Sequence, residues 1–94
     1  MTVGLCTIQL SLPGVHSLKE KRGVVKPLLH RLRAEFNVSA AEVDRQDAWQ
    51  AATIGVATVS SPDADVHGAL EGVLAWLERT QPHVFVTDWQ IEVL

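Results

Sequence analysis

Basic side chains recur along one short stretch of this chain at a spacing that could bind phosphate groups. Their steps of three, four, four and three residues would place them all on one face of an α-helix. The set is Lys19, Arg22, Lys26, His30 and Arg33. Lys and Arg in such a row contact phosphates without reading the base sequence, and their binding weakens as salt rises. The pattern therefore indicates a helix face that could meet a polyanion such as RNA.

The same stretch concentrates most of the positive charge of the chain. Residues 17–36 hold six of the eight Lys and Arg residues against two carboxylates, whereas the remainder holds two against nine. The segment thus carries +4 and the remainder −7, in a chain of net charge −3. We predict that six cations bind nucleic acid: Lys19, Lys21, Arg22, Lys26, Arg31 and Arg33. The alternative is an ordinary solvated helix face that balances an acidic protein.

A second polar cluster, Asp47, Trp49 and Gln50, lies in a turn between two apolar segments. It could form a recognition corner beside the start of the basic helix. In the alternative interpretation, Trp49 packs on the end of a sheet while nearby aspartates neutralise Lys19 or Lys21.

The cysteine and histidine residues of this chain do not form a pattern typical of a catalytic site or a metal site. Cys6 lies in an apolar segment with no cation nearby in sequence, which favours a buried structural thiol over a nucleophile. None of the four histidines lies three or four residues from another histidine or from Cys6, so we expect no metal site. We expect no cofactor and no enzymatic activity. A small-ligand site or an enzyme that uses Glu42 and Asp47 is the third hypothesis.

Length and composition indicate one folded domain over residues 1–94. Charged residues make up 20% of the chain and hydrophobic residues 47%, which excludes a disordered protein. No apolar run reaches the roughly 18 residues of a membrane span, and the first residues do not resemble a signal peptide. A single cysteine fits a reducing compartment. We expect a cytoplasmic protein with no membrane partner.

The basic residues share a face only if residues 17–36 form a helix. Ser17 and Glu20 predict a capping box, in which the Ser17 hydroxyl accepts from the Glu20 N–H and the Glu20 carboxylate accepts from the Ser17 N–H. Apolar residues recur at helical period on another face: Leu18, Val25, Leu28, Leu29, Leu32 and Phe36. Pro27 removes a backbone hydrogen bond, so we expect a kink between residues 23 and 27 rather than two helices.

Strand patterns surround that helix over residues 2–12, 37–43, 51–60 and 84–94. A second helix should begin at Ser61, with Pro62 in its first turn. The last strand predicts one alternating face: Phe85, Thr87, Trp89, Ile91 and Val93. The order β-α-β-β-α-β predicts an α+β, ferredoxin-like fold, with a four-stranded antiparallel sheet of order 4-1-3-2 and both helices on one face. In that topology the loop over residues 44–49 rises beside the start of the basic helix.

One face of such a sheet would lack helices and still carry apolar side chains, including Val3 and Leu5. Large contiguous apolar patches are rare on monomers. We therefore expect a homodimer or higher oligomer through this face or through the edge of the second or fourth strand. Trp76, at the boundary of the second helix's apolar stripe, and Trp89 are expected to be packing or interface residues.

Two families that share this topology do not fit the residues. RNA-recognition motifs stack bases on aromatic side chains of the first and third strands, and residues 2–12 and 51–60 contain no aromatic residue. Resemblance to acylphosphatases would need an arginine in the first loop, which here reads Pro13-Gly14-Val15-His16. Any contact with RNA would therefore use the basic helix.

The segments SLKEKR (17–22), FNVSAAEV (36–43) and D-x-W-Q-x-A (47–52) resemble the YlxP-like family, domain of unknown function 503, of small bacterial proteins. The similarity spans nearly the whole chain, although Pro27 and His16 depart from the family's pattern. The matching positions are Ser17, Leu18, Lys19, Glu20, Lys21, Arg22, Phe36, Asn37, Val38, Glu42, Asp47, Trp49, Gln50 and Ala52. The resemblance implies a ferredoxin-like cytosolic protein, often encoded beside ribosome-binding factor A and translation factors, with no established activity.

Together these patterns predict a non-enzymatic accessory protein that binds RNA or a ribosomal particle through its basic helix. The alternative is a homo-oligomeric protein-interaction or structural module with no nucleic-acid role. In that case the acidic remainder of one copy would meet the basic helix of a neighbour.

Overall fold

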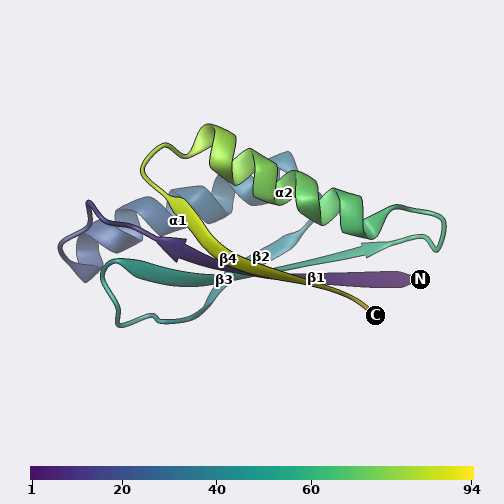
Figure 1. Ribbon diagram of the computed structural model, residues 1–94, viewed down its shortest axis with the longest axis horizontal. Coiled ribbons are helices and arrows are strands. Elements are labelled where there is room, and N and C mark those ends of the chain that lie inside the picture. Colours follow the sequence, from purple (N-terminus) through teal and green to yellow (C-terminus); the bar gives the residue numbers. More distant parts are fainter.

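Helices and strands alternate along the chain in the predicted βαββαβ order. The computed structural model describes residues 1–94, and its elements are β1 (Thr2–Ser11), α1 (Leu18–Glu35), β2 (Ser39–Asp44), β3 (Ala51–Ser60), α2 (Val66–Thr80) and β4 (Phe85–Val93). The strands form one antiparallel sheet in the order β2-β3-β1-β4 (Figure 1). Read from the other edge this is 4-1-3-2, so the predicted α+β class and sheet order are confirmed.

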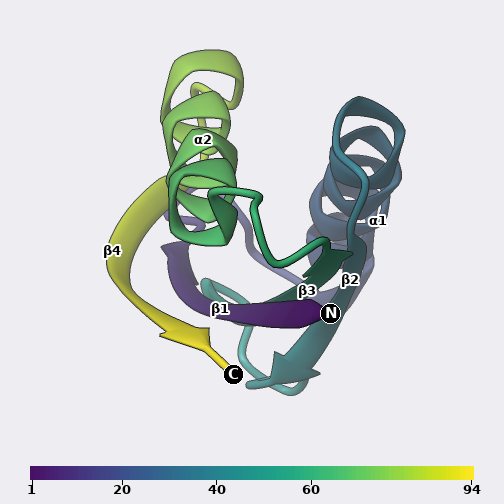
Figure 2. The same cartoon turned by 90° about the vertical axis from the view of Figure 1, so that its right-hand side faces the viewer.

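Both helices lie on the same side of the sheet, and the other side carries none (Figure 2). Alternation along β1 turns its even-numbered side chains toward the helices, where Cys6, Ile8 and Leu10 are almost fully buried. The most completely buried large side chains come from both layers: Ile8, Leu12, Leu28, Leu32, Ile54, Leu70 and Leu77. A single apolar core therefore holds the helices on the sheet.

Helix α1 begins at the predicted N-cap. The Ser17 hydroxyl accepts from the Glu20 N–H at 3.0 Å, but the Glu20 carboxylate accepts from the His16 N–H, at 2.8 Å, rather than from that of Ser17. The helix runs on through Pro27 to its C-cap at Phe36, so one helix is confirmed. The kink near Pro27 stays a prediction.

Helix α2 begins later than predicted. Its N-cap is Asp65 and not Ser61, and the Asp65 carboxylate accepts from the Gly68 N–H at 2.9 Å. Ser61 and Pro62 instead open a turn, closed by a hydrogen bond from the Ala64 N–H to the Ser61 carbonyl. At the other end of the helix, Trp76 is 7% exposed and lies in the core rather than at its boundary. Its ring packs edge-on against Phe36, with ring centres 5.9 Å apart, and so joins α2 to the end of α1.

The two edge strands differ from their predicted forms. Strand β2 begins at Ser39 rather than at residue 37. Strand β4 does not alternate regularly, because its pairing with β1 shifts between Gln9 and Leu10. Gln9 lies opposite Asp88 and Leu10 opposite Val86. The predicted single face of β4 is therefore divided at this irregularity.

No helix of the chain combines the length and the apolar character needed to cross a membrane.

Candidate functional site

The basic row of α1 faces solvent along most of the helix. We call Lys19, Arg22, Lys26, His30 and Arg33 the cationic stripe, and all five residues are exposed. Val25, Leu28 and Leu32 are buried on the other side of the helix and fix its orientation. At 1.5 Å per residue, the stripe extends for about 21 Å. Sequence periodicity thus identified a real surface feature.

No carboxylate of the chain forms an ion pair with the stripe. The structure contains two ion pairs, Lys21 with Glu42 and His67 with Glu71, and neither involves the stripe. Lys19, Arg22 and Lys26 also make no side-chain hydrogen bond within the protein, so their charges are free to meet an external anion.

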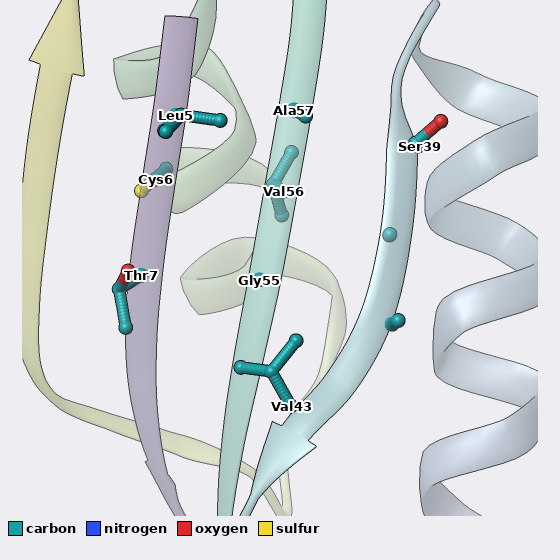
Figure 3. Close-up of a pocket in the computed structure, with 10 residues that line it drawn as sticks. Leu5, Cys6, Thr7, Ser39, Val43, Gly55, Val56 and Ala57 are labelled. Carbon is teal, nitrogen blue, oxygen red and sulfur yellow. The ribbon is translucent and has the colours of Figure 1, made fainter.

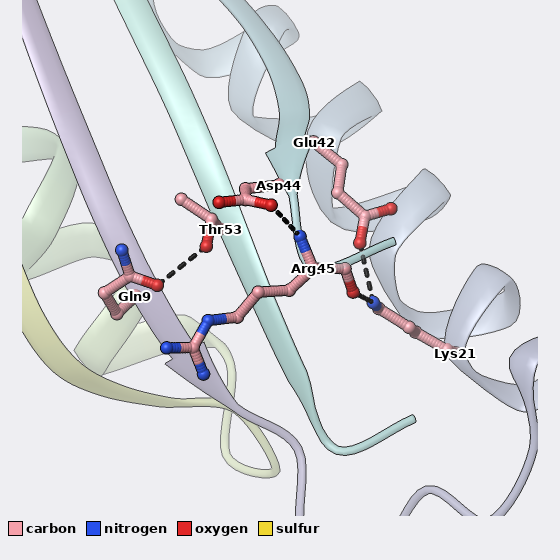
Figure 4. A network of polar contacts seen from close by, with 6 residues as sticks. All are labelled: Gln9, Lys21, Glu42, Asp44, Arg45 and Thr53. Atoms are coloured by element: carbon pink, nitrogen blue, oxygen red, sulfur yellow. Dashed lines mark hydrogen bonds and ion pairs between the residues drawn. The ribbon is translucent and has the colours of Figure 1, made fainter. Parts of the chain in front are cut away.

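Lys21 must be removed from the predicted set of nucleic-acid-binding residues. Its side chain is 3% exposed, and its ammonium lies 2.7 Å from a Glu42 carboxylate oxygen (Figure 4). The same ammonium donates to the Arg45 carbonyl at 2.7 Å. The sequence did contain a signal for this role, because Lys21 lies three residues after Leu18 and four before Val25, on the apolar stripe of the helix. Lys21 therefore ties α1 to the β2–β3 hairpin and cannot contact a partner.

Arg31 and Arg33 are exposed and are held by neutral acceptors. Arg31 donates to the Gln81 side-chain carbonyl at 3.3 Å and so links α1 to the end of α2. Arg33 donates to the Ala40 carbonyl at 2.7 Å. A guanidinium has five N–H donors and stays charged, so each of these side chains keeps donors and a full positive charge for a ligand.

Within the predicted corner of Asp47, Trp49 and Gln50, only the Gln50 side chain has hydrogen-bond partners in the chain. The Gln50 amide donates to the carbonyls of Val15, at 2.9 Å, and Pro13, at 3.3 Å. Gln50 therefore anchors the loop that precedes α1. Trp49 is 53% exposed, so the packing of its ring on the sheet end stays a prediction. Asp47 is exposed and forms no ion pair with Lys19 or Lys21.

The two other groups considered for catalysis, the Cys6 thiol and the Glu42 carboxylate, do not lie together in one site. Cys6 is 1% exposed, and burial raises the pKa of its thiol to about 11. The predicted burial of this thiol is confirmed, and the thiol is protonated at neutral pH. The Glu42 carboxylate is engaged by Lys21, so it is not a free base for the hypothesis that paired it with Asp47.

A protein family and a bacterial protein match this chain over nearly its whole length. The family model described as "Protein of unknown function (DUF503)" matches residues 3–91. The "Uncharacterized protein YlxP" of Bacillus subtilis (strain 168) is 38% identical over 90 residues, which cover 93% of this chain and 98% of that protein. Both matches include the cationic stripe and the whole of α2. Neither description names a ligand or a reaction.

Proposed function

Because this chain belongs to the DUF503 family of proteins of unknown function, its role must be inferred from its own surface, and we propose that it is a non-enzymatic accessory protein that binds RNA, free or within a ribosomal particle. The observation that carries the proposal is the cationic stripe. Its Lys and Arg side chains are exposed and lack carboxylate partners, on a chain whose net charge is −3. A cation row without internal partners can neutralise phosphates.

The chemistry of the stripe favours backbone recognition over base reading. Lys19, Arg22 and Lys26 present ammonium and guanidinium groups at successive turns, and no exposed aromatic side chain interrupts the stripe to stack on a base. Each neutralised phosphate releases condensed counterions, so the logarithm of affinity should fall with the logarithm of salt by about 0.7 per contact on a single strand. Four permanent cations thus predict a slope of roughly −3.

We further infer that the protein has a ferredoxin-like fold and lies in the cytoplasm. The βαββαβ order and the β2-β3-β1-β4 sheet agree with a ferredoxin-like fold. One buried, unpaired cysteine fits a cytoplasmic location. The second candidate function, a homo-oligomeric interaction module, is favoured by the helix-free side of the sheet, where Val59 is 55% and Val43 is 53% exposed.

Titration of labelled single-stranded and double-stranded RNA at several salt concentrations tests the proposal. The triple variant Lys19→Glu, Arg22→Glu, Lys26→Glu should lose binding while its circular dichroism and sedimentation stay those of the parent. An affinity that is independent of salt, or unchanged in the triple variant, would refute RNA binding through α1. Dissociation of an oligomer by the triple variant would instead support an interaction module in which the basic helix of one copy meets the acidic remainder of its neighbour.

A further inference from the structure

The helix-free side of the sheet, which we call the bare face, has an apolar centre. Alternation turns the odd-numbered side chains of β1 and β3 to this side, among them Leu5, Ala57 and Val59. Val59 is 55% exposed, and Val43, which lies over the neighbouring strand β3 from β2, is 53% exposed. An exposed apolar patch that spans three adjacent strands is typical of a surface that binds a partner.

A hollow of about 360 Å³ lies over β3 at the centre of the bare face (Figure 3). Leu5 and Thr7 of β1 form one wall, and Val43 of β2 forms the other. The floor is low because Gly55 has no side chain and Ala57 has only a methyl group. The hollow therefore gives an apolar side chain of a partner a place to pack.

The charged side chains of the sheet are all acidic. The four strands contain four carboxylates and no lysine, arginine or histidine. Glu42 binds Lys21 on the helix side, and none of the other three carboxylates forms an ion pair. These three are Asp44, Asp88 and Glu92.

The three unpaired carboxylates lie on the bare face, at its two edges. On β4, Asp88 and Glu92 pair with odd-numbered residues of β1, and directly paired residues share a face. On β2, Asp44 pairs with Thr53, whose hydroxyl donates to the Gln9 side chain of β1 at 2.7 Å. An acidic group therefore borders the apolar centre on each side.

One cation lies among these groups. Arg45 follows β2, and its side chain extends across β3 toward Gln9 (Figure 4). Three carboxylates against one guanidinium leave this face with a net charge of −2. A second copy of the chain would bring an equally acidic face, and like charges placed across an interface oppose binding. The charges of the bare face match those of a basic partner instead.

We propose that the bare face binds a basic amphipathic helix of another protein. The apolar side of that helix packs on β1 and β3 and fills the hollow over Gly55 and Ala57. Lysine or arginine side chains along its flanks reach the carboxylates at both edges of the sheet. An apolar centre inside a charged rim is the usual anatomy of a protein interface.

The width of the sheet suits a single helix. Three spacings of about 4.8 Å separate β2 from β4, so the two edges lie about 14 Å apart. A helix with its side chains is about 10–12 Å in diameter. One helix therefore covers the two central strands while its flanks face the edge strands. The same layer packing already places α1 and α2 on the opposite side of this sheet.

This proposal does not rest on RNA binding. The cationic stripe belongs to α1, which lies on the other side of the sheet (Figure 2). The two surfaces are also opposite in charge, so each selects a different kind of partner. A chain that uses both would hold a polyanion on its helix side and a basic protein on its bare face.

Nuclear magnetic resonance titration with synthetic peptides tests the proposal. The probe is a designed helix with leucine on one side and lysine on the other, and two matched peptides replace its lysines by glutamate or its leucines by serine. The leucine–lysine helix should shift the amide signals of β1 and β3. The glutamate peptide should not bind, and the serine peptide should bind at least about tenfold more weakly.

Charge changes on the bare face should alter this affinity in opposite directions. The double variant Asp88→Asn, Glu92→Gln should weaken binding of the leucine–lysine helix by about threefold to tenfold. Asparagine at residue 88 keeps the oxygen that accepts from the Trp89 N–H. Arg45→Asn removes the one cation and should tighten binding by about twofold, and asparagine tolerates the φ of 61° at this position.

Matched controls on α2 separate a local effect from net charge. The double variant Glu71→Gln, Glu78→Gln also removes two carboxylates, and Arg79→Asn also removes one cation, from exposed positions of α2. Neither control should change the affinity by as much as twofold. The triple variant of α1 should still bind the leucine–lysine helix, so failure of RNA binding and failure of this proposal are separate results.

Four results would overturn the proposal. The first three are signal shifts that map to α2, equal binding of the serine peptide, and an affinity that is unchanged in the double variant Asp88→Asn, Glu92→Gln. The fourth is a parent protein that sediments as a dimer and that Ala57→Arg, at the centre of the face, converts to a folded monomer. A second copy, and not a basic helix, would then occupy the bare face.

Discussion

The inner and outer sides of α1 carry the same kinds of charged residue and use them differently. Lys21 on the inner side is buried and bound to Glu42 and to the Arg45 carbonyl. Lys26 on the outer side is exposed and has no partner in the chain. Burial removes hydration from a charge and makes a partner necessary, whereas solvent screens an exposed charge and leaves it free. Position around the helix, rather than residue type, therefore decides which cations stabilise the fold and which are free to bind a partner.

Removing the inner cation should have the largest effect. Lys21→Ala leaves Glu42 and the Arg45 carbonyl without a donor, and we expect the free energy of unfolding to fall by about 3 kcal/mol. Lys26→Ala removes the same charge from the outer side and should change stability by less than about 0.5 kcal/mol. Urea denaturation of both variants measures the contrast.

A compensating change sharpens this comparison. The double variant Lys21→Met, Glu42→Leu removes both charges together, so it should recover much of the stability that Lys21→Ala loses. Equal losses in the single and double variants would mean that packing, and not the ion pair, explains the effect of residue 21.

The buried thiol of Cys6 in β1 should make stability depend on pH, which the exposed side chains of α1 should not do. Burial raises its pKa from 9.0 to about 11, so between these values the unfolded chain loses the proton before the folded chain does. The folded state then binds more protons, and stability falls as pH rises through this window, by up to about 2–3 kcal/mol. Cys6→Ala should remove this part of the alkaline loss, measured as the difference in urea midpoints of the two proteins between pH 8 and about pH 11.

Single charge changes on the outer side should alter binding without altering stability. Lys26→Glu in the stripe should weaken RNA binding by about tenfold and reduce the salt slope by roughly one contact. Arg79→Glu makes the same change of charge on α2 and should have a much smaller effect. Fluorescence anisotropy titrations of the two variants decide between a local stripe and the net charge of the protein, because equal effects would favour net charge.

The two sides of α1 also differ in how well the sequence predicted them. Periodicity placed Lys19, Arg22 and Lys26 correctly on one exposed face, because helical geometry alone determines that result. The prediction for Lys21 was wrong, although its spacing from Leu18 and Val25 puts it beside the apolar side chains of the helix. The partner of Lys21 depends on how the β2–β3 hairpin folds back onto α1. That contact joins residues 21 and 42, and it could not be read from local spacing.

Other errors have the same origin in distant contacts. Ser61 and Asp65 are both good N-caps, and local sequence could not decide between them. The irregularity of β4 arises from its pairing with Gln9 and Leu10, almost eighty residues earlier in the chain. Because of this shift, Val86 and Asp88 lie on different faces of the sheet, although their spacing predicted a single face.

The smallest expected effect lies at Gly23, on the exposed side of α1. A Cβ added there meets no atom within 4 Å, so Gly23→Ala should stabilise the protein by about 0.5–1 kcal/mol through helix propensity. Gly4→Ala in β1 is the buried control, because its Cβ would overlap a Val66 methyl carbon of α2, and it should destabilise the protein. RNA binding should be unchanged by Gly23→Ala.

The sign of the Gly23 effect also bears on the predicted kink. Pro27 cannot donate to the Gly23 carbonyl, and a bend at this point would use the conformational freedom of glycine. A gain in stability would indicate ordinary helical backbone angles at residue 23, with the proline accommodated on the solvent side. A loss, measured against Gly72→Ala in α2, where a Cβ is equally unobstructed, would indicate that the outer side of α1 is bent at residue 23. The cationic stripe would then change direction between Arg22 and Lys26, and the phosphates it could contact would have to follow that bend.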